Sequence, residues 1–113
     1  MRGANERWAA EERGQRLLRS WLSPEQSRQY DEQGSFEVIG GDTGKRYRIC
    51  KGDVFNIQEL DDCGIQVSTL CVTAYGVATG DINLAQKIAL ETDEHGALAV
   101  ANRFRLNSFE QGS

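Results

Sequence analysis

A chain of 113 residues has room for one domain with a single core, and its 39% of hydrophobic residues exclude a disordered chain. A net charge of −4 and a pI near 5.0 disfavour nucleic acid as the default partner, because an acidic surface repels phosphate backbones. No apolar run approaches the roughly 18 residues of a membrane span. Residues 1–16 also lack the apolar segment of a signal peptide, so we expect a cytoplasmic protein.

The N-terminal part of the chain follows a helical pattern. Residues 1–16 are rich in Arg, Glu and Gly, and we expect them to form a partly ordered extension of a single domain at 17–105. The large apolar residues that follow share one helical face, which predicts a first helix from about Trp8 to Leu22 with Trp21 in the core. The residues of that face are Leu17, Leu18, Trp21 and Leu22.

A second helix is predicted directly after the first. Ser23 can cap it, Pro24 suits the first helical position, and Gln26 stands where a capping box needs Glu or Gln. Gly34 tolerates the left-handed conformation of a helix end, so the helix should stop there. Tyr30 is its only large apolar residue, which places this helix mostly on the surface.

From Phe36 onward the side-chain pattern has a period of two, which predicts β-strands. Pairing the first two strands across a turn at 41–44 gives one register that puts apolar pairs on the inner face and an opposite-charge pair on the outer face. The pairs are Phe36 with Ile49, Val38 with Tyr47, and Glu37 with Arg48.

Two further strands should complete a four-stranded antiparallel meander. A tight turn would place Ile49 across from Phe55 on the inner face. A second turn at 61–64 leads into a strand at 65–72, whose alternation loses phase near Ser68, and a bulge would explain that loss.

The end of the chain predicts one long helix that packs on the sheet. Asp81 is a good N-cap, strong helix formers follow it, and Phe104 lies on the apolar stripe that runs to about Arg103. The helix should be bent or broken at 95–96. A polar tail at 106–113 should be flexible. The predicted fold is therefore α+β, in the order helix, helix, four strands, helix.

Two local patterns superficially suggest a ligand site. Residues 40–45 resemble a phosphate-binding loop, but the spacing of the glycines is too short, Arg46 follows the lysine, and a strand follows the loop. A hairpin turn is the better interpretation. Residues 91–95 gather three carboxylates beside the single histidine, but a metal site needs further ligands, so an exposed helical ion pair between Glu91 and His95 is favoured.

The cysteines indicate reduced thiols, mostly buried, because Cys50, Cys63 and Cys71 fit neither a disulfide framework nor a zinc site. Cys63 lies in a predicted turn and is the thiol to test for reactivity. A Ser or Cys nucleophile activated by imidazole would have to meet His95 in space. We therefore predict no catalytic residue, no cofactor and no metal.

Two surfaces remain as candidates for binding. Trp8 lies among charges and could anchor a partner, because aromatic residues and Arg are enriched at interface hot spots. A helix that extends beyond the domain would also serve to form a homodimer. The alternative is nucleic-acid binding by a basic strand face, whose residues are Lys45, Arg46, Arg48 and Lys51.

The absence of a catalytic pattern favours a non-enzymatic protein-interaction domain, an adaptor or small inhibitor. We expect its protein partner, whose identity the sequence does not give, to bind through Trp8, Arg46, Arg48 and Lys51.

Four short segments, taken together, carry a resemblance to other proteins. They are residues 21–26, 47–49, 56–61 and 84–87. With these segments the chain resembles a group of small, uncharacterised bacterial α+β proteins that have no assigned function. The resemblance covers most of residues 17–104 and implies no activity, cofactor or site.

Overall fold

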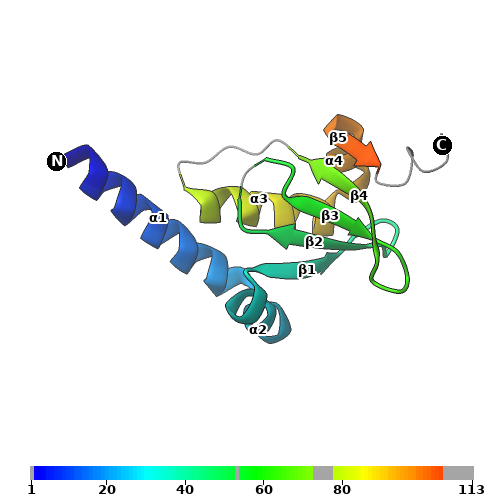
Figure 1. The fold of residues 1–113 in the computed structure, drawn as a ribbon, viewed down its shortest axis with the longest axis horizontal. Coiled ribbons are helices and arrows are strands. Elements are labelled where there is room, and N and C mark those ends of the chain that lie inside the picture. The colour runs from blue at the N-terminus through cyan, green and yellow to red at the C-terminus, as the bar shows by residue number, and fades with distance from the viewer. Residues whose placement is uncertain (1, 53, 73–77, 106–113) are drawn as a thin grey trace, which may run out of the picture.

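The computed structural model describes residues 2–52, 54–72 and 78–105, and it has the predicted α+β architecture (Figure 1). The predicted tail at 106–113 lies outside the described residues. Within these ranges, no helix combines the length and the apolar composition needed to cross a bilayer. The elements are α1 (Arg2–Trp21), α2 (Pro24–Gln33), β1 (Ser35–Ile39), β2 (Arg46–Cys50), β3 (Ile57–Leu60), β4 (Gln66–Cys71), α3 (Thr79–Thr92), α4 (Glu94–Val100) and β5 (Asn102–Arg105).

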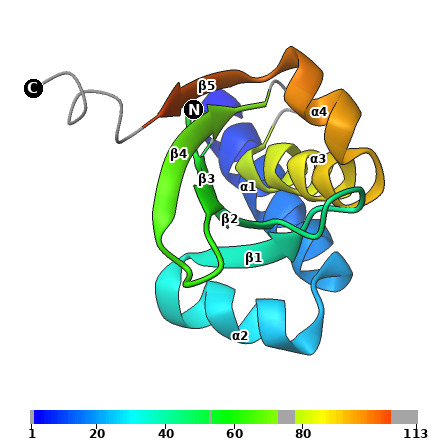
Figure 2. The same ribbon diagram turned by 90° about the vertical axis from the view of Figure 1, so that its right-hand side faces the viewer.

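The strands form one antiparallel meander in the order β1-β2-β3-β4-β5. Figure 2 shows α1 and α3 on one side of this sheet and α2 running along β1. Helix α3 packs against β1 and β2, and α1 packs against α3. The buried core between these layers consists of Leu18, Tyr30, Phe36, Val38, Tyr47, Ile49, Ile57, Leu70, Val72, Leu84, Leu90 and Ala97.

Local chemistry sets the second helix and the first hairpin as predicted. The Ser23 side chain accepts from the Gln26 N–H, the Gln26 side chain accepts from the Ser23 N–H, and Gly34 ends α2 at φ 74°. The predicted hairpin register is confirmed in full, with Phe36 opposite Ile49, Val38 opposite Tyr47, and Glu37 opposite Arg48.

The first helix buries only part of its predicted apolar face. Leu18 is fully buried, but Trp21 is 56% exposed, so its predicted place in the core is wrong. Trp21 is exposed because α1 packs against α3 elsewhere, at the contact between Gly14 and Gly80. Trp21 lies about two helical turns beyond that contact, at the end of the helix.

The connection between β2 and β3 differs from the tight turn that the sequence predicted. Ile49 pairs with Ile57 instead of Phe55, and the Cys50 N–H donates to the Asn56 carbonyl at 2.8 Å, so the connection is longer than predicted. Phe55 adopts a left-handed φ of 48° in this loop, and its side chain is 46% exposed. Nothing in the identity of a phenylalanine predicts that conformation, which glycine ordinarily supplies.

The predicted bulge in the fourth strand is present. Glu59 pairs with Ser68 and Leu60 pairs with Gln66, so Val67 is the extra residue. This shift turns Ser68 toward the inner face, while the preceding residues of the strand, Gln66 and Val67, are half-buried.

The C-terminal region corrects the prediction of one long helix. Helix α3 begins at Thr79, so Asp81 stands in its first turn and is not the N-cap. The break falls at Asp93, whose side chain accepts from the Gly96 N–H and caps α4. After α4 the chain adds a fifth strand beside β4, with Phe104 opposite Thr69.

Candidate functional site

The structure divides the predicted basic face among three places. Arg46 and Arg48 lie on the outer face of the sheet, away from α3. Lys45 belongs to the inner side, where its Nζ is 3.2 Å from a carboxylate oxygen of Glu59. Lys51 lies in the loop after β2, beside α1. The four residues therefore do not form one outward surface.

The two outer arginines are largely compensated. Arg46 Nη2 donates to Glu37 Oε1 at 3.0 Å, and Arg48 Nη2 lies 3.6 Å from the other oxygen of the same carboxylate. Arg48 also donates to the Gln58 side chain at 3.0 Å. Because one glutamate serves both arginines, nucleic acid would find less positive charge here than the sequence suggests.

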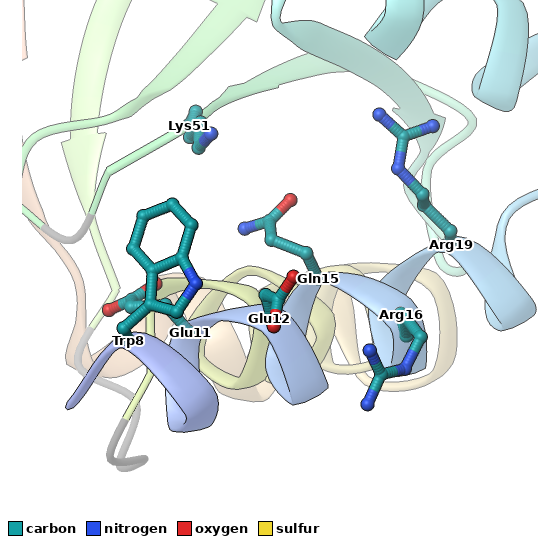
Figure 3. Close-up of a pocket in the computed structure, with 7 residues that line it drawn as sticks. All are labelled: Trp8, Glu11, Glu12, Gln15, Arg16, Arg19 and Lys51. Carbon is teal, nitrogen blue, oxygen red and sulfur yellow. The ribbon is translucent and has the colours of Figure 1, made fainter. Parts of the chain in front are cut away.

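A groove of about 480 Å³ lies between α1 and the loop that carries Lys51 (Figure 3). Its helix residues recur at the three- and four-residue spacing of one face of α1, and Figure 3 shows Trp8, Gln15 and Arg19 projecting toward the Lys51 side. The structure thus brings together two of the predicted partner-binding residues. The lining consists of Trp8, Glu11, Glu12, Gln15, Arg16, Arg19 and Lys51.

The far wall of the groove is fixed to the core by buried amides. Asn83 Nδ2 donates to the carbonyl oxygen of Gly52, 2.7 Å away, directly after Lys51. Asn56, at the end of the same loop, exchanges hydrogen bonds with Gln86 of α3 at 2.8 and 3.1 Å. Both amide residues of α3 are fully buried, so the loop that carries Lys51 is held in position before any partner binds.

Trp8 is the most exposed large aromatic side chain on the described part of the helices, with 69% of its surface accessible. An indole offers a large apolar area and an N–H donor at little cost in rotamer entropy. Because Trp8 lies beside a groove, a binding partner can contact both the indole and the concave surface of the groove.

Gln15 supplies an unsatisfied donor at the groove. Its Oε1 accepts from the Tyr30 hydroxyl at 2.6 Å, which fixes the orientation of the amide. Its Nε2 is buried and has no hydrogen-bond partner among the described residues. A buried donor without an acceptor costs about 1–3 kcal/mol. A partner would recover that energy by displacing the side chains that cover this atom and supplying an acceptor. Sequence reasoning missed Gln15, because a lone glutamine on a helix gives no signal.

The charged residues of the groove fall into two groups. Glu11 accepts from the Thr79 N–H at 3.3 Å, and Arg19 pairs with Asp31 while its guanidinium lies 5.0 Å above the Tyr30 ring. These two are engaged within the fold. Among the described residues, the others make no ion pair within 4.0 Å, and they are Glu12, Arg16 and Lys51.

At the other end of the sheet, the carboxylate of Glu94 is fully buried. Its Oε1 accepts from the N–H groups of Asp42 and Thr43 at 3.0 and 2.7 Å. Its Oε2 accepts from the Thr43 and Tyr47 hydroxyls, each at 2.6 Å. Burial alone would raise the pKa of Glu94, but these hydrogen bonds outweigh burial and lower it. Burial and the bond to Glu94 raise the pKa of Tyr47.

The turn at 40–44 is shaped around that carboxylate. A Cβ at Gly40 would lie 2.2 Å from the Glu94 carboxyl group, so only glycine fits. The adjacent glycines were the one available sign of Glu94, which sequence reasoning did not identify. Because the fold itself supplies all the donors, Glu94 is an anchor of the fold and offers no vacancy for a ligand.

The ion pair predicted between Glu91 and His95 is wrong, because a break in the helix separates them. Glu91 pairs instead with Lys87 at 2.7 Å, and His95 Nδ1 lies 3.5 Å from Asp42. In the part of the chain that the structure describes, no three side chains of the metal-ligating types lie close enough together to hold an ion.

The cysteines are free, as expected, but less buried than predicted. Cys63 is exposed in its turn, while Cys50 and Cys71 are half-buried on the sheet. Burial raises the pKa of Cys50, which makes that thiol less nucleophilic at neutral pH.

No known protein family, curated protein or solved structure matches this chain. Its geometry is therefore the basis for a functional proposal. Among the sites described above, the groove beside α1 is the one with an unsatisfied donor and an exposed aromatic side chain.

Proposed function

We propose that the chain is a non-enzymatic protein-interaction domain, an adaptor or small inhibitor, whose protein partner docks in the groove between α1 and Lys51. The observation that carries this proposal is the pairing of a 69% exposed Trp8 with a buried, unpartnered Gln15 Nε2 at the same groove. Interface hot spots combine such an aromatic anchor with polar groups that become satisfied on binding.

The mixed charge of the groove favours a protein partner. Glu12 lines the groove together with Arg16 and Lys51, so the groove has neither the uniformly positive surface that a nucleic acid needs nor an uncharged lining. A protein supplies an apolar side chain for Trp8, a carbonyl acceptor for Gln15 and a carboxylate for Lys51.

The proposal predicts that Trp8→Ala abolishes capture of the partner, while Trp21→Ala does not. The two tryptophans lie on the same helix and are both exposed, but Trp21 is outside the groove, which makes it a matched control. The measurement is affinity purification with the full chain as bait in extracts of its native host, followed by mass spectrometry. Loss of a central anchor costs about 2 kcal/mol or more, or roughly thirtyfold in affinity.

Thermal melts of both variants should match the wild type, because neither side chain is buried. If the same proteins are retained by wild type, Trp8→Ala and Trp21→Ala alike, the groove is not the docking site. The variant Gln15→Leu removes the unsatisfied donor but also the acceptor of the Tyr30 hydroxyl, so it tests the groove only if its thermal melt matches that of the wild type.

A further inference from the structure

The order of the charges along α1 points to the identity of the partner. We propose that the protein that docks at the groove is a second copy of this chain, whose α1 lies antiparallel to the first in a two-fold symmetric dimer. This inference rests on the proposed docking at the groove, to which it adds the kind of partner.

The exposed side chains of the groove form one stripe along α1. Trp8, Glu12 and Arg16 follow one another at intervals of four residues, and all three are exposed. The spacing of Glu12 and Arg16 would allow an ion pair along the helix, but among the described residues neither makes one within 4.0 Å. Both charges are therefore available to a partner.

The sign of the charge reverses along this stripe. Glu12 precedes Gly14 and Arg16 follows it, and the groove residues Glu11 and Arg19, although engaged within the fold, have the same order. A matching segment must carry the opposite order of charges. A second α1 that runs antiparallel has that order, whereas a parallel one would bring like charges together.

A two-fold axis at the level of Gly14 would pair the charges of both copies at once. Glu12 and Arg16 lie two positions on either side of Gly14, so Glu12 of each copy faces Arg16 of the other. The two ion pairs are about 6 Å apart along the helix. Trp8, six positions before Gly14, lies level with Ser20 of the second copy, an exposed small residue that leaves room for the indole.

The second copy can approach this side of α1 without meeting the rest of the first copy. Gly14 is buried against α3, and Leu18 is buried in the core. Arg16 is two positions from each, which places it about 200° around the helix from both, on the opposite side. Figure 1 also shows the N-terminal end of α1 extending beyond the sheet and α3, so a partner helix has space along this face.

The first test is sedimentation equilibrium of the full chain over a range of concentrations. We expect a reversible dimer that weakens as the salt concentration rises, because the two ion pairs are at the surface. Trp8→Ala should weaken the dimer about tenfold or more. Trp21→Ala, an exposed tryptophan of the same helix outside the groove, should not. A wild-type chain that stays monomeric at every concentration would overturn the proposal.

Charge reversal tests the antiparallel arrangement directly. Glu12→Arg and Arg16→Glu should each weaken the dimer about tenfold or more, because each brings like charges together in both symmetric pairs. An equimolar mixture of the two variants should form a heterodimer, since one copy then carries two arginines and the other two glutamates. Arg13→Glu is the matched control: it makes the same change of charge at an exposed position of α1 that does not line the groove, and it should leave the dimer intact. A mixture that remains monomeric contradicts the arrangement.

Affinity purification separates the dimer from the docking on which it rests. Retention of the endogenous chain by the wild-type bait, and its loss with Trp8→Ala, would support both. If the wild type sediments as a monomer while Trp8→Ala loses other retained proteins, the groove binds a different partner and the dimer alone is excluded. If Trp8→Ala changes neither sedimentation nor retention, the groove is not a docking site and both proposals fail.

Discussion

The position of the Glu94 carboxylate explains the sequence pattern at residues 40–45. Residues 40–45 superficially resemble a phosphate-binding loop, and their backbone N–H groups do bind an anion. The anion is a side chain of the same protein, which accepts hydrogen bonds from Thr43, Asp42 and Tyr47 and pairs with no cation of the described residues. A loop that resembles a ligand-binding loop can therefore bind an anionic side chain of its own fold.

This arrangement predicts that stability falls in acid. The folded-state pKa values of Glu94 and Glu59 are lowered by hydrogen bonds that outweigh burial. Both groups therefore stabilise the fold above their unfolded pKa of about 4.3, and this contribution is lost as the pH falls through the folded-state values. Urea unfolding between pH 7 and pH 3 should show a decreasing free energy of unfolding.

Glu94→Gln identifies the residue responsible. The variant should be less stable by about 2 kcal/mol at pH 7, and its stability should depend less on pH than that of the wild type. Glu32→Gln, at an exposed position on α2, should follow the wild-type profile. A wild-type free energy that stays constant down to pH 3 would contradict the prediction.

Some residues of the candidate sites could be identified from the sequence, and others could not. Trp8 and Lys51 were identified as partner-binding candidates, and the structure places both beside one groove. Gln15 could not be identified, because its unsatisfied amide results from the bond that Tyr30 makes to the other atom of the group. The exposure of Phe55 depends on a backbone angle that its side chain disfavours.

At the level of elements, two predictions from local chemistry were confirmed, whereas the N-cap at Asp81, the tight turn after β2 and the helix through Phe104 were wrong. The capping box of α2 and the register of the first hairpin each involve residues close in sequence. β5 was predicted as helix, because the preceding residues favour helix and Phe104 continues their spacing. Its strand conformation comes from pairing with β4, which the local sequence does not encode.

The contact between α1 and α3 gives a prediction at this scale. A Cβ at Gly80 would lie 2.2 Å from the carbonyl oxygen of Gly14, so Gly80→Ala must separate the helices. We expect a loss of about 2 kcal/mol in the free energy of unfolding, although alanine favours helix over glycine. Ser20→Ala, at an exposed position on α1, should change stability little, and urea melts compare the two. A stabilised Gly80→Ala variant would show that the helices are not in close contact.

On the scale of the whole molecule, the loop between β2 and β3 borders two hollows of the surface: Lys51 lines the α1 groove, and Phe55 lines an apolar pocket with Thr69 and Phe104. The N-terminal end of α1 and the strand β5 lie toward opposite ends of a molecule whose longest dimension is 52 Å (Figure 1).

The charge of the whole molecule predicts weak or absent binding to nucleic acid, the alternative function. The net charge is −4, and the outer arginines share Glu37. Anisotropy of a labelled single-stranded oligonucleotide in about 50 mM salt should therefore show no change on addition of the protein. Salt-sensitive binding that is lost on Arg48→Glu would revive this alternative, because it would map the contact to the strand pair.

The glutamines that cover Glu37 limit how copies of this protein can assemble. A fibre built by sheet extension needs two complementary edges on every subunit, and among the described residues the β1 edge is the one whose central backbone groups are already bonded. Growth through the backbone would therefore end after a single pairing event. A molecule that keeps one strand accessible thereby avoids polymerisation.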